Sequence, residues 1–241
     1  MSMWLLRVFA TAIRRRQILP IASVAGAQKA ILRDAAAIAV CAEREAEQIG
    51  LDISPISRAC VVPHISDFTS PMNVTTQLGL IVVPGRIEAR KNQIAALRIA
   101  QHFPELTFLF VGALSPYEKR YVAEFLLTLG QTANARHVAA LPKEEFYPVL
   151  SSAELVLNAS FFEVTSLIDL YCIENSIPLV TTLHTYARAS GAFRVFDPMS
   201  VGEGVRALRE CLVQSRQDGR KITSAKENNS MSIVELIEGL L

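Results

Sequence analysis

The sequence has almost no excess of charge of either sign. Its 24 lysines and arginines stand against 23 aspartates and glutamates, which gives a formal net charge of +1. Proteins that hold nucleic acid along its phosphate backbone carry a clear positive excess. We therefore expect no nucleic acid partner, and any anionic ligand must be held by a local cluster of basic side chains.

Metal and redox motifs are also lacking. The four cysteines, Cys41, Cys60, Cys172 and Cys211, form no CxxC pair, the four histidines are scattered, and no Walker loop is present. We expect no metal ion and no cofactor. A chain of 241 residues that is 51% hydrophobic does not need disulfides. The cysteines therefore predict buried thiols in a reducing compartment, the cytoplasm, with two disulfides as the alternative.

The N-terminus lacks the order of a secretory signal and the length of a membrane span. The apolar stretch that begins at Met1 is followed, not preceded, by basic residues that end at Arg16, and it is shorter than the roughly 20 apolar residues of a spanning helix. We expect an amphipathic helix that packs on the protein. The alternative is an interfacial helix from Met1 to Arg16, with Trp4 at the lipid headgroups, which would give peripheral membrane contact.

What the sequence does contain is a regular alternation of short apolar runs and longer amphipathic stretches. Short apolar runs at 35–41 and 60–63 flank a charged stretch at 42–49. Strands are then predicted at 78–83, 106–111, 136–141, 154–158, 179–182 and 192–196. Helices are predicted at 92–103, 116–130, 143–150, 165–175 and 201–212, with Pro116 opening the second and Gly130 as its left-handed stop. This order predicts an α/β fold: a Rossmann-like parallel sheet with helices on both faces.

Ligands of such sheets bind beyond the carboxyl ends of the strands, so the residues there are the candidate site. After the first long strand come Gly85, Arg86 and Lys91. Glycine lets the backbone approach a ligand, and a guanidinium fork with an ammonium suits a diphosphate. Arg90 in the same loop is expected only to be solvated.

A second segment runs from the strand ending near Asn158 into a helix. Thr165 and Ser166 are placed where hydroxyls and backbone N–H groups can face phosphate oxygens. Glu163 can accept hydrogen bonds from sugar hydroxyls, although an acidic residue here also favours the helix N-terminus by up to about 1 kcal/mol. Both roles are compatible.

Together these segments resemble the C-terminal, donor-binding domain of retaining glycosyltransferases of the GT-B fold, in the family-4 group (glycosyl transferases group 1). The family pattern of Gly-Arg, four residues and Lys matches Gly85, Arg86 and Lys91. In the family the linker before this domain ends in a motif like Ile-Pro-Asn-Gly-Val-Asp, and residues 62–67 resemble it loosely. The family also has a strand that finishes in Asp-Pro, which Asp197 and Pro198 match. The resemblance spans most of the chain.

The resemblance implies roles for individual residues. Arg86 and Lys91 would bind the donor diphosphate and Glu163 the transferred sugar, and these three form the implied catalytic set. The leaving phosphate would deprotonate the acceptor, so no protein base is implied. The full implied donor-binding set is Gly85, Arg86, Lys91, Glu163, Val164, Thr165, Ser166, Leu167 and Tyr171.

The chain departs from the family pattern in two places. Tyr171 stands where the family has a second glutamate that holds the nucleotide ribose, and Glu174 follows three residues later. The resemblance further implies that the N-terminal domain, which carries the acceptor in this fold, would be mostly missing from this sequence. We therefore predict three parts: 1–67, a helical remnant of the acceptor domain with the linker; 68–213, the nucleotide-sugar-binding domain; and 214–241, a polar connection and C-terminal helix.

The implied function is that of a glycosyltransferase, or of its donor-binding portion. It would transfer a sugar from an NDP-sugar to a glycan or lipid-linked acceptor in cell-envelope assembly, with retention of configuration. The short N-terminal part leaves three explanations open: a truncated reading frame, a separate chain that supplies the acceptor domain, or a protein without transfer activity. The alternative function is a non-catalytic nucleotide-sugar-binding or partner-binding remnant.

Overall fold

The computed structural model describes residues 24–35, 38–41, 43–56, 59–62, 74–185 and 194–217. They belong to two compact units, Met1–Pro63 and His64–Leu241. Four sequence predictions lie outside the described residues: the N-terminal helix up to Arg16, most of the linker motif at 62–67, the domain boundary after residue 67, and the C-terminal helix.

The first unit is a small strand–helix–strand arrangement. Its elements are α2 (Val24–Asp34), β1 (Ile38–Val40), α3 (Glu43–Asp52) and β2 (Ala59–Val61). The two strands pair in parallel, with Ala39 opposite Cys60, and α3 is the crossover between them. The two short apolar runs predicted from the sequence are therefore strands, and this unit is not purely helical.

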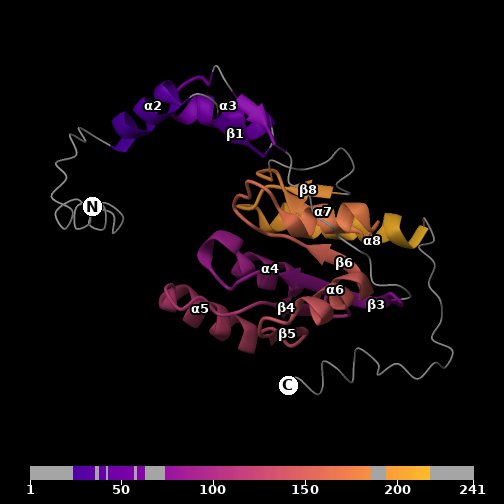
Figure 1. Cartoon of the computed structure of the whole chain (residues 1–241). Coiled ribbons are helices and arrows are strands. Elements are labelled where there is room, and N and C mark those ends of the chain that lie inside the picture. Colours follow the sequence, from indigo (N-terminus) through magenta and orange to yellow (C-terminus); the bar gives the residue numbers. More distant parts are fainter. Residues whose placement is uncertain are drawn as a thin grey trace. The chain divides into compact units, whose positions relative to one another are not determined.

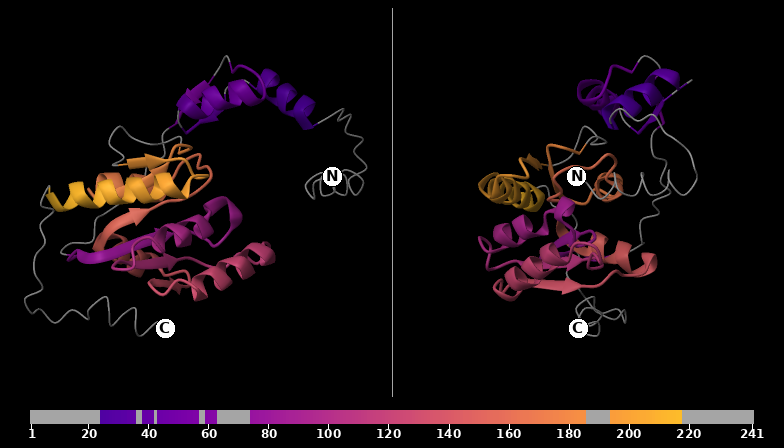
Figure 2. Two further views of the ribbon diagram at one scale, coloured as in Figure 1. Left: turned by 180° about the vertical axis from the view of Figure 1, so that it is seen from behind. Right: turned by 90° about the vertical axis from the view of Figure 1, so that its left-hand side faces the viewer.

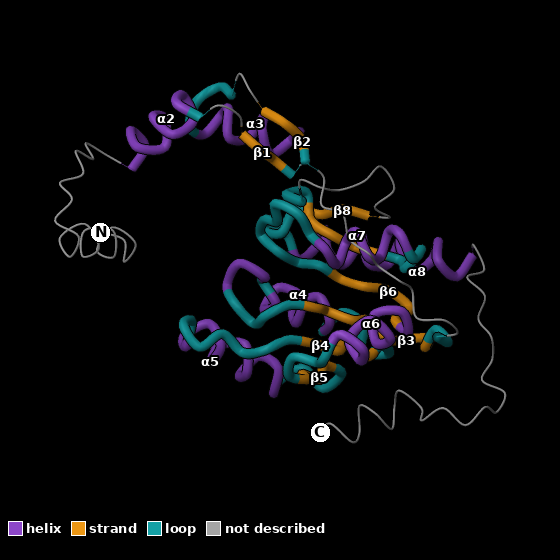
Figure 3. The backbone as a smooth tube through the Cα atoms, viewed as in Figure 1, coloured by secondary structure: helices purple, strands orange, loops and turns teal. Residues whose placement is uncertain are grey.

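The second unit contains a six-stranded parallel sheet (Figure 1, Figure 3). Its strands are β3 (Gln77–Pro84), β4 (Thr107–Val111), β5 (Ala135–Val138), β6 (Ala153–Leu157), β7 (Leu179–Thr182) and β8 (Arg194–Phe196). Their order across the sheet is β5-β4-β3-β6-β7-β8, and every pair is parallel. From β3 the following strands β4 and β5 are added toward one edge of the sheet, whereas from β6 the strands β7 and β8 are added toward the other edge. The boundary between β3 and β6 is therefore the switch point, where doubly wound sheets bind ligands.

Helices cover both faces of this sheet (Figure 2). They are η1 (Ala89–Lys91), α4 (Gln93–Ala100), α5 (Lys119–Gly130), α6 (Lys143–Ser152), α7 (Leu167–Glu174) and α8 (Val201–Gln217). Alternate residues of β3 point to opposite faces: Ile81 and Val83 belong to the core under α4, α5 and α8, and Leu80 and Val82 to the core under α6 and α7. Since both faces are buried, the strand is a continuous apolar run. The predicted fold class is confirmed.

Two features of α5 differ from the prediction. The helix begins at Lys119 rather than at Pro116, because the preceding residues follow the loop after β3: the Ser115 N–H donates to the Ile87 carbonyl (3.1 Å), and the Glu118 carboxylate accepts from the Ala89 N–H (2.6 Å). Gly130 is still helical and is not a left-handed stop. Tertiary hydrogen bonds set the start of this helix.

The last described helix is longer than predicted. Residues 214–217, expected in a polar connection, continue α8 to Gln217. Arg216 explains the extension, since its guanidinium lies 2.6 Å and 3.2 Å from the two carboxylate oxygens of Glu154. Glu154 is buried in β6 and also accepts from the Gly79 N–H. The ion pair therefore anchors the end of α8 at the base of the sheet.

Candidate donor-binding site

Two loops meet at the switch point of the sheet. The loop after β3 carries Gly85, Arg86 and the turn η1, and the loop after β6 leads through Glu163 into α7. Because β3 and β6 are neighbours, their carboxyl ends bring the loops side by side. The Phe161 N–H donates to the Arg90 carbonyl (2.9 Å) and joins them directly.

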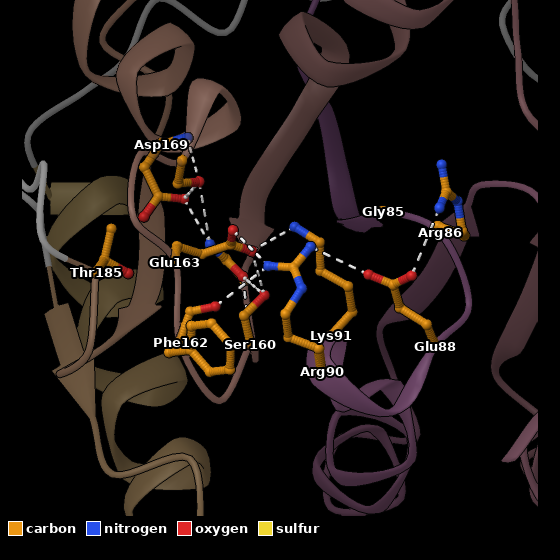
Figure 4. Close-up of polar contacts among 12 residues, drawn as sticks. Gly85, Arg86, Glu88, Arg90, Lys91, Ser160, Phe162, Glu163, Asp169 and Thr185 are labelled. Atoms are coloured by element: carbon orange, nitrogen blue, oxygen red, sulfur yellow. Dashed lines mark hydrogen bonds and ion pairs between the residues drawn. The ribbon is translucent and has the colours of Figure 1, made fainter. Parts of the chain in front are cut away.

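Glu163 is the centre of this site (Figure 4). The Lys91 ammonium pairs with its Oε1, and Arg90 Nη1 lies 2.8 Å from its Oε2. The Glu163 side chain is only 7% exposed. Burial by itself would raise the pKa of Glu163, but the hydrogen bonds from Lys91 and Ser160 and the charges of Lys91 and Arg90 outweigh it and lower that pKa. Glu163 is therefore an ionised carboxylate held between two cations.

Arg86 does not join this pair. Its side chain is 61% exposed and lies 3.8 Å from Glu88 Oε2. In Figure 4, Arg90 lies between Glu163 and Glu88, and Arg86 lies beyond Glu88. The structure thus brings together Lys91 and Glu163 of the predicted set and adds Arg90, for which the sequence predicted only solvation; that expectation is wrong.

Gly85 has the close-approach role expected of a glycine, but toward Lys91. Its φ of 134° disfavours other residues, and a Cβ built there would lie 3.4 Å from Cδ of Lys91. The lysine stem therefore lies over the Gly85 backbone. Gly112, at the end of β4, packs still closer: a Cβ on it would be 2.2 Å from the Gly85 carbonyl oxygen.

Gln93 and Tyr121 fix the same loop and were missed by the sequence reasoning. Gln93 is buried, and its Nε2 donates to the Arg86 carbonyl (2.7 Å). The Tyr121 hydroxyl donates to Gln93 Oε1 (3.2 Å) and accepts from the Ile94 N–H (3.2 Å). Burial, only partly offset by hydrogen bonds, raises the pKa of Tyr121 to about 12. No local pattern in the sequence marks this pair, because the two residues lie 28 positions apart and meet only in the fold.

Asn92 connects the site to β8. It adopts a left-handed conformation (φ 55°) between η1 and α4, and this kink ends the turn that presents Arg90 and Lys91. Its Nδ2 donates to the Pro198 carbonyl (3.0 Å). Pro198 follows Asp197 directly after β8, so the Asp-Pro motif seen in the sequence supports the cationic turn.

Two hydroxyls lie at the N-terminus of α7, and only one of them makes hydrogen bonds. Ser166 caps the helix: its Oγ accepts from the Asp169 N–H (3.2 Å) and lies 2.7 Å from Asp169 Oδ1. Thr165 Oγ1 is the one buried side-chain polar atom without a hydrogen-bond partner among the residues that the structure describes. Val164 and Leu167 are 40% and 42% exposed beside it. Thr165, rather than Ser166, therefore has the hydroxyl whose hydrogen bonds are unmade at this helix end.

A buried network of hydrogen-bonded polar side chains contacts Glu163. The Ser160 hydroxyl lies 2.7 Å from both Glu163 Oε1 and Asn158 Oδ1, so its one proton is shared between these acceptors. Asn158 Nδ2 donates to Asp169 Oδ1 (2.8 Å), and the Thr181 hydroxyl donates to Asp169 Oδ2 (2.6 Å). Burial raises the pKa of Asp169 despite these hydrogen bonds. The network fixes the Glu163 carboxylate in position.

Tyr171 lies away from the site. Its side chain is fully buried in the core under α6 and α7, its hydroxyl is 2.7 Å from Ser151 Oγ, and its ring centroid is 4.5 Å from that of Tyr147. Glu174 is exposed at the far end of α7. Alignment with the family placed Tyr171 at the ribose, but this face of the helix points into the core, so we correct that assignment.

None of the helices in the described parts of the chain combines the length and the hydrophobicity of a membrane span. No model of a protein family matches the chain, and no curated protein matches it in sequence.

Solved structures, in contrast, match the chain over most of its length. HepE of Anabaena, in complex with UDP and glucose, is 15% identical with a TM-score of 0.68, and the match covers 82% of this chain and 60% of HepE. Sucrose-phosphate synthase of Thermosynechococcus elongatus is 16% identical with a TM-score of 0.67, over 91% of this chain and 62% of that enzyme. WaaG, a glycosyltransferase involved in lipopolysaccharide biosynthesis, is 19% identical with a TM-score of 0.58, over 74% and 54%.

These likenesses establish the fold. The second unit is a Rossmann-like α/β domain of the kind found in GT-B glycosyltransferases. The chain spans less than two thirds of the length of each of these three neighbours.

Proposed function

We propose that this chain binds the NDP-sugar donor of a retaining, family-4-like glycosyltransferase reaction. The observation that carries the proposal is the Lys91–Glu163 pair at the β3–β6 switch point. A cation that is 19% exposed stands beside a carboxylate that is 7% exposed, where doubly wound sheets bind nucleotides. HepE, a neighbour with the same fold, has been crystallised with UDP and glucose.

In the proposed complex each group has one task. Lys91 stabilises the charge that develops on the leaving diphosphate, and Glu163 accepts hydrogen bonds from hydroxyls of the transferred sugar. The distal phosphate lies at the N-terminus of α7, where the backbone N–H groups of 164–167 and the Thr165 hydroxyl are the donors. The bond between the anomeric carbon and phosphate breaks, the acceptor oxygen attacks from the same face, and the leaving phosphate takes the acceptor proton.

The rest of the reaction also belongs to the proposal. The acceptor is a glycan or lipid-linked molecule of the cell envelope, and transfer takes place in the cytoplasm. The acceptor domain is supplied by a separate chain. Peripheral membrane contact through the stretch from Met1 to Arg16 would bring the donor site to a lipid-linked acceptor.

Calorimetric titration of the protein with UDP, GDP and ADP tests the donor site. We expect at least one of them to bind wild-type protein, and Lys91→Ala to weaken that binding about tenfold or more, as expected for the loss of one charged hydrogen bond. Lys119→Ala is the matched control, since Lys119 is exposed at the start of α5. A folded wild-type protein that binds none of the three would refute the proposal.

A further inference from the structure

Two neighbouring cations share one carboxylate at the switch point. Arg90 and Lys91 are consecutive residues of η1, and each engages a different oxygen of Glu163. Arg90 Nη1 also lies 3.3 Å from the Phe162 carbonyl, and its Nη2 lies 3.1 Å from Glu88 Oε1. Only Lys91 of these two cations belongs to the pattern found in the sequence.

The cations of this loop are already paired. Arg86 and Arg90 lie beside Glu88, Arg90 and Lys91 beside Glu163, and the Glu118 carboxylate accepts from the Ala89 N–H of the same turn. The Glu163 carboxylate stays ionised because its pKa is lowered, and both of its oxygens are already engaged by cations. An arriving diphosphate therefore gains a cation by drawing it away from Glu163, and this exchange frees a carboxylate oxygen for a sugar hydroxyl.

We infer that Arg90, in place of Arg86, is the second cation of the donor diphosphate, exchanging Glu163 for phosphate when the donor binds. This inference rests on the proposed function. The Arg90 side chain is 37% exposed and so accessible to a ligand, and its guanidinium offers the planar fork that phosphate oxygens accept. Arg86 lies beyond Glu88, away from the Lys91–Glu163 pair.

The test compares charge-dependent binding in matched variants. Wild type, Arg90→Gln, Arg90→Lys and Arg86→Gln are titrated with whichever of UDP, GDP and ADP binds wild type, and with its monophosphate. We expect Arg90→Gln to weaken diphosphate binding about 10- to 100-fold, with a smaller loss for the monophosphate, and Arg90→Lys to give an intermediate loss. Arg86→Gln should change diphosphate binding by less than about threefold.

Each other result overturns the inference in a distinct way. If Arg90→Gln binds the diphosphate as tightly as wild type or more tightly, Arg90 only pairs with Glu163 and does not contact the ligand. An equal loss for monophosphate and diphosphate would mean that the substitution acts through loop structure alone. A larger loss in Arg86→Gln than in Arg90→Gln would return the role to Arg86. If Arg90→Gln does not fold, the other two variants decide. The inference then requires that Arg86→Gln binds the diphosphate as tightly as wild type and that Arg90→Lys binds it more weakly. If wild type binds no nucleotide, the proposed function itself fails.

Discussion

Gly112→Ala should damage both the fold and the site, because the end of β4 packs directly on the loop after β3. The added Cβ would lie 2.2 Å from the Gly85 carbonyl oxygen and 2.6 Å from its carbon. Both contacts are with backbone, which no rotamer change relieves, so the two segments must separate by about 1 Å or more to reach van der Waals distance. Overpacking of this kind costs about 1–3 kcal/mol, and occasionally more.

Thermal unfolding followed by circular dichroism measures the effect. For a domain of this size, 1–3 kcal/mol corresponds to a fall in Tm of about 2–12 °C. Because the Lys91 stem lies over Gly85, nucleoside diphosphate binding should weaken as well. Gly130→Ala is the matched control: a Cβ there meets nothing within 4 Å, so Tm should stay constant or rise slightly. An unchanged Tm in Gly112→Ala would refute this packing.

Three further predictions concern ion pairs and thiols. Arg216→Ala should lower the free energy of unfolding in urea by about 1–3 kcal/mol, because it leaves the buried Glu154 without its cationic partner. The prediction of buried thiols is confirmed for Cys172 and Cys211 but is wrong for Cys60, which is exposed. In thiol-labelling kinetics on the native protein, Cys60 should react quickly, whereas Cys211, whose pKa burial raises to about 11, should react only after unfolding. Glu163→Gln should be destabilising at pH 7, and less so in acid.

The acid dependence follows from the sign of the shift. The pKa of Glu163 lies below its ordinary value of 4.5 in the folded protein, so its stabilising contribution is complete above 4.5 and is lost as the pH falls through the folded pKa. The stability difference between wild type and Glu163→Gln, from urea unfolding, should therefore be constant above pH 4.5 and narrow as the pH falls below it. A constant or widening difference over that acid range would contradict the ion pairs described.

Fast native-state labelling of Cys211, or an Arg216→Ala variant as stable as wild type, would contradict the other two predictions.

The fold was largely predictable because most of its strands are short apolar runs, and some of them end directly at glycine or proline. The β3 run ends at Pro84 and Gly85, and the loop residues that follow are polar. What failed were helix ends that depend on distant residues. The start of α5 is set by contacts with the loop after β3, and the end of α8 by the Arg216–Glu154 pair across 62 residues. No local pattern contains that information.

The site could be located from the sequence, but the directions of its side chains could not. Position after a strand identifies Lys91 and Glu163 as neighbours of the switch point. Whether Arg86 or Arg90 turns toward Glu163 depends on the η1 turn. That turn ends at the left-handed Asn92, whose side chain donates to the carbonyl of Pro198 in the segment after β8. Likewise, Tyr171 lies in the core because it is on the buried face of α7. A family alignment does not record which face of a helix is buried.

The most direct test of the central claim is a crystal structure of this protein with the nucleoside diphosphate that binds it. The proposal predicts the diphosphate at the β3–β6 switch point, with one phosphate beside the Lys91 ammonium and the other at the N-terminus of α7 near the Thr165 hydroxyl. A nucleotide bound elsewhere on the protein, with Lys91 and Glu163 still paired to each other and touching no ligand, would contradict it.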